Sequence, residues 1–149
     1  MSTDIRVSIE ADADMLPARA EGRALADRLG FSRTDATLIA TAISEIARNI
    51  LRHAGSGEII LTEVNKDGRR GLSVVARDDG PGIRDVAAAI QEGYSGVNGG
   101  SGLGLPGARR LMDDFDIVSA VGEGTTVTMR KWRTRDELEQ LHEKRRNGD

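Results

Sequence analysis

The sequence predicts an α+β two-layer sandwich, with helices packed on one face of a mixed, mostly antiparallel sheet. Three observations predict this fold: an opening run with the two-residue period of a strand, a long helical pattern that begins near Ser32, and two later pairs of strand-like runs joined by short turns. Because the chain has 149 residues, one core and one functional site are expected.

The first half of the chain contains one predicted strand and two predicted helices. Residues 5–9 alternate apolar and polar side chains, which is typical of a half-buried strand. Helical spacing runs over residues 15–29, and Gly30 follows where a helix commonly ends. A second helix covers residues 32–54 and stops at the Gly-Ser-Gly sequence of residues 55–57.

The second half contains two predicted hairpins with helical segments between them. The first hairpin turns at Asp67-Gly68, a dipeptide that favours tight turns, and the second turns at residues 122–124. The glycines between Gly93 and Gly104 exclude regular structure there. The predicted elements are strands 58–64 and 72–76, a short helix at 86–91, a helix at 105–113, and strands 115–121 and 125–132.

The predicted domain covers residues 1–133, and residues 134–149 form a charged C-terminal extension. Thr134 and Glu137 make a capping-box pattern that can open a helix in this extension. Its only large apolar residues are two leucines, so it has little apolar surface to bury.

Composition narrows the class of partner and the compartment. A net charge of −3 with charges of both signs provides no field that gathers nucleic acid or an anionic membrane, so neither is expected as a partner. No apolar run approaches the roughly 18 residues that span a bilayer. The absence of cysteine fits a reducing compartment, and the cytoplasm is the expected location.

The helix at residues 32–54 carries polar side chains beside its apolar stripe. Glu45 and Asn49 point at or next to that stripe, where a buried carboxylate and amide need partners, such as a bound ion with an activated hydroxyl beside it. Alternatively, the two form a rim and hydrogen-bond each other at i,i+4 spacing. His53 lies on the same side and is interpreted as a structural residue. The stripe recurs at every fourth residue, at Leu38, Ala42, Ile46 and Ile50.

Two glycine-rich segments add groups that can bind a nucleotide. Asp78 follows a strand and opens the segment Asp78–Gly82, where its carboxylate can accept a hydrogen bond from an exocyclic amino group such as that of adenine. The segment Gly100–Gly104 leads directly into a helix, whose N-terminal amides can bind a phosphate. Each segment taken alone can also be an ordinary turn or loop.

Other phosphate-binding patterns fit this chain poorly. Gly102, Gly104 and Gly107 satisfy the dinucleotide fingerprint, but no buried strand directly precedes them, as that fingerprint requires. The chain also lacks the P-loop and the catalytic loops of eukaryotic-type protein kinases. Mg²⁺ held by Asn49, together with backbone amides of the glycine loop, is the expected means of offsetting phosphate charge, with arginines such as Arg109 as further helpers.

Taken in chain order, these motifs resemble the conserved boxes of the GHKL (Bergerat-fold) ATPases over about residues 5–132. Within that superfamily the chain is similar to the small serine-protein kinases of bacterial sigma-factor regulation, and most similar to the RsbT-type switch kinases of stressosomes. The phrases that carry this similarity are Thr41–Ile50, Gly102–Gly107, Arg110–Asp113 and Lys131-Trp132. The superfamily motifs are Glu45-x-x-x-Asn49, Asp78-x-Gly80-x-Gly82, Gly100-x-Gly102-x-Gly104-Leu105 and Gly124-Thr125.

The resemblance implies a role for each matching residue. Asn49 would bind Mg²⁺, Glu45 would be the base that activates the attacking hydroxyl, and Asp78 would accept from the adenine amino group of ATP. Residues 83–99 would form a short lid over the nucleotide. The further ATP-binding residues that the resemblance implies are Gly80, Gly82, Gly100, Gly102, Gly104, Leu105 and Thr125.

The resemblance also implies partners. An RsbT-type kinase would phosphorylate a serine or threonine of a STAS-domain regulator and would then activate a PP2C-type phosphatase by binding it. Two alternatives remain open: an anti-sigma factor of the RsbW or SpoIIAB type, which binds a sigma factor and phosphorylates its antagonist, and a nucleotide-gated binding protein without transfer activity.

Overall fold

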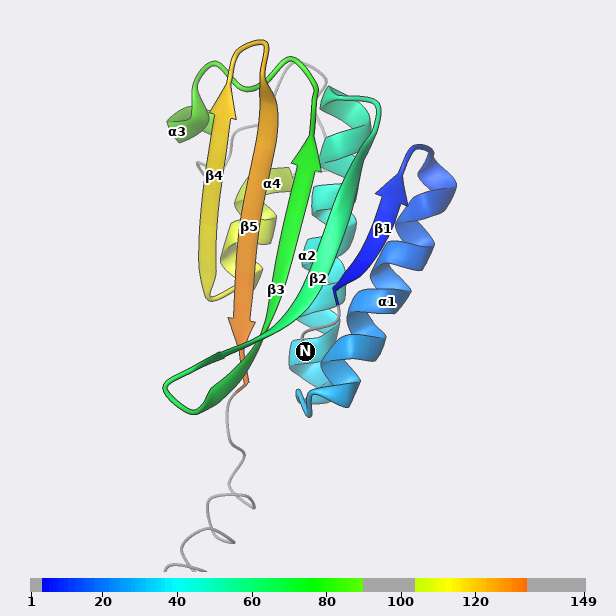
Figure 1. Cartoon of the computed structure of the whole chain (residues 1–149), viewed down its shortest axis with the longest axis vertical. Helices are drawn as coiled ribbons and strands as arrows, with labels where there is room; N and C mark the ends of the chain where they lie inside the picture. Colours follow the sequence, from blue (N-terminus) through cyan, green and yellow to red (C-terminus); the bar gives the residue numbers. More distant parts are fainter. Residues whose placement is uncertain (1–3, 90–103, 134–149) are drawn as a thin grey trace, which may run out of the picture.

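A computed structural model describes residues 4–89 and 104–133 of the chain (Figure 1). Within those two ranges, none of the helices combines the length and the apolar character needed to cross a bilayer. In chain order the elements are β1 (Ile5–Ile9), the 3-10 helix η1 (Asp12–Asp14), α1 (Met15–Arg28), α2 (Arg33–His53), β2 (Gly57–Lys66), β3 (Arg69–Asp78), α3 (Val86–Ala89), α4 (Gly104–Leu111), β4 (Asp114–Ala120) and β5 (Gly124–Trp132).

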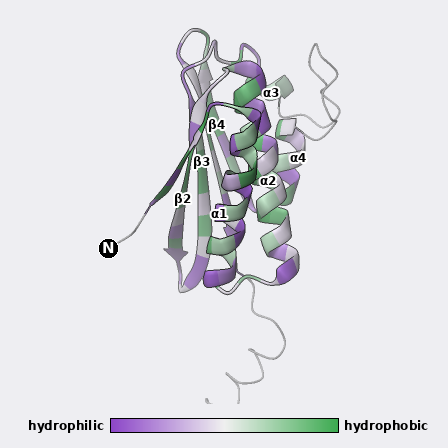
Figure 2. Ribbon diagram, turned by 90° about the vertical axis from the view of Figure 1, so that its right-hand side faces the viewer, coloured by the Kyte–Doolittle hydropathy of each residue, from purple (hydrophilic) through white to green (hydrophobic). Residues whose placement is uncertain are grey.

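The fold has two layers, a five-stranded sheet of order β1-β2-β3-β5-β4 and a helical layer on one of its faces (Figures 1 and 2). This confirms the predicted α+β sandwich. The prediction of a mixed sheet is wrong for the described residues, because all four strand pairings are antiparallel. The crossover through α4 makes β4 parallel to β3, but β5 returns between these two strands and is antiparallel to both.

The first hairpin is longer than predicted. β2 and β3 pair from Glu58 opposite Arg77 to Lys66 opposite Arg69, well beyond the runs that show strand-like patterning. The connection is Asp67-Gly68, and both residues have positive φ, 53° and 79°, as a tight turn between twisted strands requires. The polar ends of these strands are therefore held by the ladder and the turn rather than by burial.

Helix α2 lies at the centre of the core and packs against α1, α4 and the sheet. The predicted stripe on α2 was too narrow: Ile39 and Ile43 are fully buried, whereas Leu38 is only half-buried. A helix with neighbours on three sides buries a wider face than a single every-fourth-residue row. Gly22 allows close packing of α1 here, because a Cβ at that position would overlap the side chain of Ile43.

Helix α2 begins where the sequence predicts, and Ser32 is its N-cap. The Ser32 hydroxyl accepts a hydrogen bond from the backbone N–H of Asp35 at 3.1 Å. We expect Ser32→Ala to lower the free energy of unfolding by about 1 kcal/mol, because one N-terminal amide then loses its partner. Urea denaturation measures this loss. Ser32→Asp is the control and is expected to retain the stability of the parent protein; an equal loss in both variants would contradict the capping role.

Candidate functional site

Glu45 lies on α2 with its carboxylate buried, and both of its oxygens have donors. The residue is 5% exposed. Arg48 Nη1 lies 2.7 Å from Oε1, and the backbone N–H of Gly104 donates to Oε2 at 2.9 Å. Glu45 therefore connects α2 to the first residue of α4, 59 positions away in the chain. The sequence left open an alternative in which Glu45 hydrogen-bonds to Asn49. In the structure the two Glu45 oxygens instead contact Arg48 and the backbone N–H of Gly104.

Asn49 is half-buried, one helical turn after Glu45 and directly after Arg48. This agrees with the predicted position beside the apolar stripe. The interpretation of His53 as an inward structural residue is wrong, because its side chain is exposed. His53 is the last residue of α2.

Asp78 is the last residue of β3 and is 9% exposed. Its Oδ1 accepts from the backbone N–H of Gly80 at 2.9 Å, which shapes the turn that follows. In the sheet register Asp78 lies opposite Thr125 of β5, which is 6% exposed. The structure thus brings together two residues that were both predicted to bind ATP but lie far apart in the sequence.

Glycines surround Asp78 because other backbone passes very close to it. At Gly80 an added Cβ would lie 2.5 Å from the Cβ of Ala54, at the end of α2. Gly82 and Gly124 both have positive φ, 79° and 89°. An added Cβ would overlap the carbonyl of Ala120 in the case of Gly82 and that of Asp78 in the case of Gly124. These glycines are required by the close packing of the loop after β3, the β4–β5 hairpin and α2.

Sequence reasoning missed Ser119, which connects the two loops at this end of the sheet. Its hydroxyl accepts from the backbone N–H of Ile83 at 2.7 Å and lies 2.8 Å from Thr125 Oγ1. It also donates to the carbonyl of Gly124 at 3.1 Å. A serine within an alternating strand carries no local signal of this role, because its partners come from distant parts of the chain. Arg48 was also missed, and its position three residues after Glu45 could have indicated the ion pair.

Helix α4 is held at both ends by side chains of other elements. Gly104, at its N-terminus, has φ of 51° and donates to Glu45, and Leu105 is buried in the core. At the other end, Lys131 of β5 donates to the carbonyl of Leu111 at 3.1 Å. The N-terminus of α4 is thereby fixed next to α2. Gly100 and Gly102, predicted to bind phosphate, lie outside the described residues, as does most of the predicted lid.

Helix α2 joins the two parts of the candidate site. Glu45 contacts the start of α4, whereas Ala54 contacts the Gly80 turn after Asp78. These positions are nine residues apart, which corresponds to roughly 14 Å along a helix axis. One helix therefore spans the distance between a predicted phosphate end and a predicted adenine end, with Asn49 between them.

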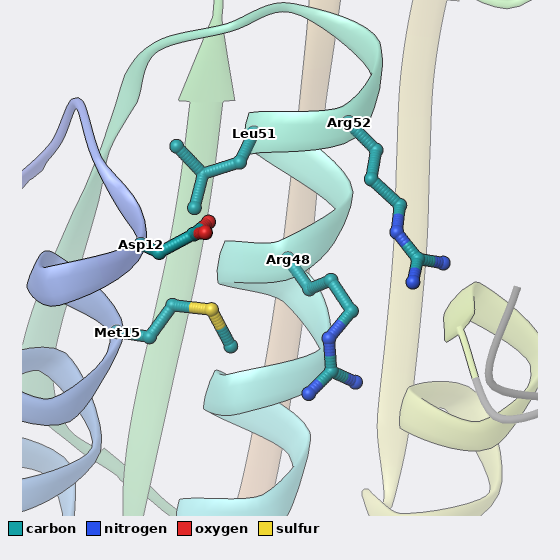
Figure 3. A pocket seen from close by; sticks show the side chains of 5 residues that line it. All are labelled: Asp12, Met15, Arg48, Leu51 and Arg52. Carbon is teal, nitrogen blue, oxygen red and sulfur yellow. The ribbon is translucent and has the colours of Figure 1, made fainter.

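An open pocket of about 400 Å³ borders the same helix and is lined by Asp12, Met15, Arg48, Leu51 and Arg52. Figure 3 shows Asp12 and Met15 on the α1 side of this pocket, while Arg48 and Arg52 project from α2 on the side of α4. Arg48 therefore both lines this pocket and contacts the Glu45 carboxylate.

A metal-binding cluster of three or more histidine, cysteine, aspartate or glutamate side chains does not occur among the residues that the structure describes. Mg²⁺ does not require such a cluster, because it usually takes one or two protein oxygens and completes its shell with water and phosphate oxygens. The half-buried amide of Asn49 can supply one such oxygen.

Comparisons with known proteins agree with the fold. The model of the histidine kinase-like ATPase domain matches residues 9–131, and the chain belongs to this family. It is 46% identical to the serine/threonine-protein kinase RsbT of Bacillus subtilis over 126 residues, which cover 85% of this chain and 94% of RsbT. The serine-protein kinase RsbW of Bacillus cereus is 32% identical over 141 residues, covering 83% of this chain and 86% of RsbW.

These similarities make the chain an enzyme, a protein kinase built on an ATPase domain. Solved structures support the fold alone. Full-length ShkA in complex with AMPPNP has a TM-score of 0.52 and 21% identity, and the match covers 83% of this chain but 30% of ShkA. The mycobacterial sensor histidine kinase MprB also has a TM-score of 0.52, with 15% identity, 90% of this chain and 100% of that structure covered.

Proposed function

We propose that this protein is an ATP- and Mg²⁺-dependent serine/threonine-protein kinase that phosphorylates STAS-domain regulators in a bacterial, cytoplasmic stress-response pathway. The observation that carries the proposal is the contact of Glu45 with Gly104, because it joins the proposed base to the glycine loop of the phosphate end. The 46% identity to a serine/threonine-protein kinase supports the choice of acceptor.

In the proposed reaction, the acceptor hydroxyl oxygen attacks the γ-phosphorus of ATP. A new phosphorus–oxygen bond forms, the bond from the γ-phosphorus to the β–γ bridging oxygen breaks, and ADP leaves. The hydroxyl proton passes to the Glu45 carboxylate. Each carboxylate oxygen can accept more than one hydrogen bond, so the contacts of Glu45 with Arg48 and Gly104 leave an acceptor site for the hydroxyl.

The nucleotide would lie along α2. Asp78 and Thr125 would bind the adenine end, next to Gly80 and Gly82, and the backbone at Gly104 and Leu105 would bind the phosphates together with Gly100 and Gly102. Asn49 would hold the metal between these ends. When bound, Mg²⁺ would neutralise part of the phosphate charge and orient the phosphate oxygens.

Incubation with labelled ATP, Mg²⁺ and purified STAS-domain proteins from the same genome tests the proposal. Label is expected on a serine or threonine of at least one of them. The kinase proposal fails if ATP binds but no STAS protein is labelled. Binding of a PP2C-type phosphatase, expected for a switch kinase, can be measured in the same preparations by co-purification.

An anti-sigma factor is the second candidate, because the chain also resembles proteins of that class. An anti-sigma F factor of Caldanaerobacter subterraneus is 30% identical over 99 residues, covering 63% of this chain and 68% of that protein. If this candidate is correct, a tagged form should co-purify a sigma factor. Recovery of a STAS protein and a phosphatase without any sigma factor would favour the switch kinase.

Asp78 provides a test of the nucleotide site that does not depend on the acceptor. We expect Asp78→Asn to weaken ATP binding by about 10- to 100-fold, since the loss of a hydrogen bond to a charged acceptor costs about 1.5–3 kcal/mol. Asparagine can still accept from Gly80 N–H, so the turn is expected to remain. Isothermal titration calorimetry with ATP measures the change, and Asp79→Asn, at an exposed position, is the control. Equal affinity of Asp78→Asn and the parent protein would exclude Asp78 from the site.

A further inference from the structure

Arg48 contacts the Glu45 carboxylate, which accepts the proton of the attacking hydroxyl in the proposed reaction. The Arg48 side chain is 34% exposed, but the Glu45 side chain that it contacts is only 6% exposed, and the Nη1–Oε1 distance is 2.7 Å. A short, charge-assisted contact to a buried acceptor fixes orientation more strongly than a pair exposed to water. Arg48 is also next to Asn49 in the chain, so its backbone position is fixed by the same helical turn.

The second oxygen of Glu45 is held from another direction. Gly104 N–H donates to Oε2 across the gap between α2 and α4, while Arg48 holds Oε1 from within α2. Figure 3 shows that Arg48 projects on the side of α2 that faces α4. Two donors from different directions prevent free rotation of the carboxylate about its last side-chain bond. The remaining acceptor sites of both oxygens therefore keep fixed directions.

We propose that Arg48 is a positioning residue for phosphotransfer, holding the Glu45 carboxylate in the orientation that receives the proton of the acceptor hydroxyl. The inference rests on the proposed kinase function and adds a residue that acts through Glu45. Of the two contacts that the described residues make with this carboxylate, the loss of Arg48 would leave the one with Gly104, and Glu45 would sample other rotamers. A misplaced base lowers the rate of the chemical step without weakening substrate binding to the same extent.

The kinetic test compares Arg48→Ala, Arg48→Lys and the parent protein in the phosphotransfer assay. For Arg48→Ala we expect kcat to fall about tenfold while KM for ATP changes less than about twofold. Arg48→Lys retains a charged donor and is expected to recover most of the loss. Arg52→Ala is the matched control, since it removes an arginine from the same pocket one turn further along α2, and we expect its kcat to remain within about twofold of the parent value.

A second measurement reports how firmly the Glu45 carboxylate is held and does not require phosphotransfer. Because Glu45 accepts from Gly104 N–H, a mobile carboxylate should let that amide exchange with solvent faster. Hydrogen exchange followed by NMR is expected to show faster exchange of Gly104 in Arg48→Ala and no change in Arg52→Ala. If Arg48→Ala does not fold, Arg48→Gln replaces it in both measurements.

Several results would overturn the assignment. These are an unchanged kcat in Arg48→Ala, an unchanged exchange rate at Gly104, or a parallel loss of kcat and ATP affinity that lysine does not restore. A parent protein that binds ATP but phosphorylates no STAS protein would instead contradict the proposed function. In that case the exchange rate of Gly104 still decides whether Arg48 positions Glu45.

Discussion

Replacement of Glu45 by glutamine is expected to lower kcat for phosphotransfer by about 10²- to 10⁴-fold while ATP still binds. Glutamine cannot accept the hydroxyl proton as a carboxylate does. It retains one carbonyl oxygen that can accept from Gly104 N–H, so the start of α4 is expected to stay in place. Phosphate transfer and ATP affinity, measured on the same preparation, separate the chemical step from binding.

Glu45→Ala is a less specific variant, although it removes the same carboxylate. It also takes away the acceptor of Gly104 N–H and the partner of Arg48, so we expect weaker ATP binding and a loss of about 1–3 kcal/mol in stability. Ser44→Ala is the control, because Ser44 precedes Glu45 but contacts Arg19 of α1. A Glu45→Gln protein that transfers phosphate within tenfold of the parent rate would rule out Glu45 as the base.

Replacement of Gly124 by alanine is expected to destabilise the protein by about 3 kcal/mol or more. Its φ of 89° is unfavourable for a residue with a Cβ, which costs about 1–2 kcal/mol, and the new Cβ would overlap the backbone of Asp78. The strand end that carries Asp78 must then move away from β5. We therefore also expect weaker ATP binding, which calorimetry can measure beside urea denaturation.

Gly122→Ala separates backbone strain from close packing in the same hairpin. Gly122 has nearly the same φ, 83°, but a Cβ there would have no heavy atom within 4 Å. Its expected loss is about 1 kcal/mol. Similar losses in the two variants would show that the approach of Gly124 to Asp78 contributes nothing to stability.

The strands and helices were predictable because their signals are local. The alternation at residues 5–9, the start of a helix near Ser32 and the Asp67-Gly68 turn are each determined by neighbours in the chain, and each lies where it was predicted. The fully antiparallel pairing of the described strands was not predicted, because it depends on the return of β5 between β3 and β4. The width of the buried face on α2 likewise depends on the packing of α1 and α4 against it. The spacing of apolar residues along α2 carries no information about that packing.

For the candidate site, the sequence by itself determined which residues share an element. Helical periodicity places Glu45 and Asn49 on one side of α2, and a strand end followed by glycines places Asp78 in a turn. These are consequences of backbone geometry over a few residues. The family resemblance was carried by the same short motifs, and the match over residues 9–131 confirmed it.

Only the tertiary structure decided what these residues contact. The hydrogen bond from Gly104 to Glu45 and the network of Ser119 with Ile83 and Thr125 each join segments that only packing brings together. Such contacts depend on the relative placement of whole helices and hairpins, which local periodicity does not contain. For the same reason the sequence was consistent with a hydrogen bond between Glu45 and Asn49, whereas in the fold the two Glu45 oxygens contact Arg48 and Gly104.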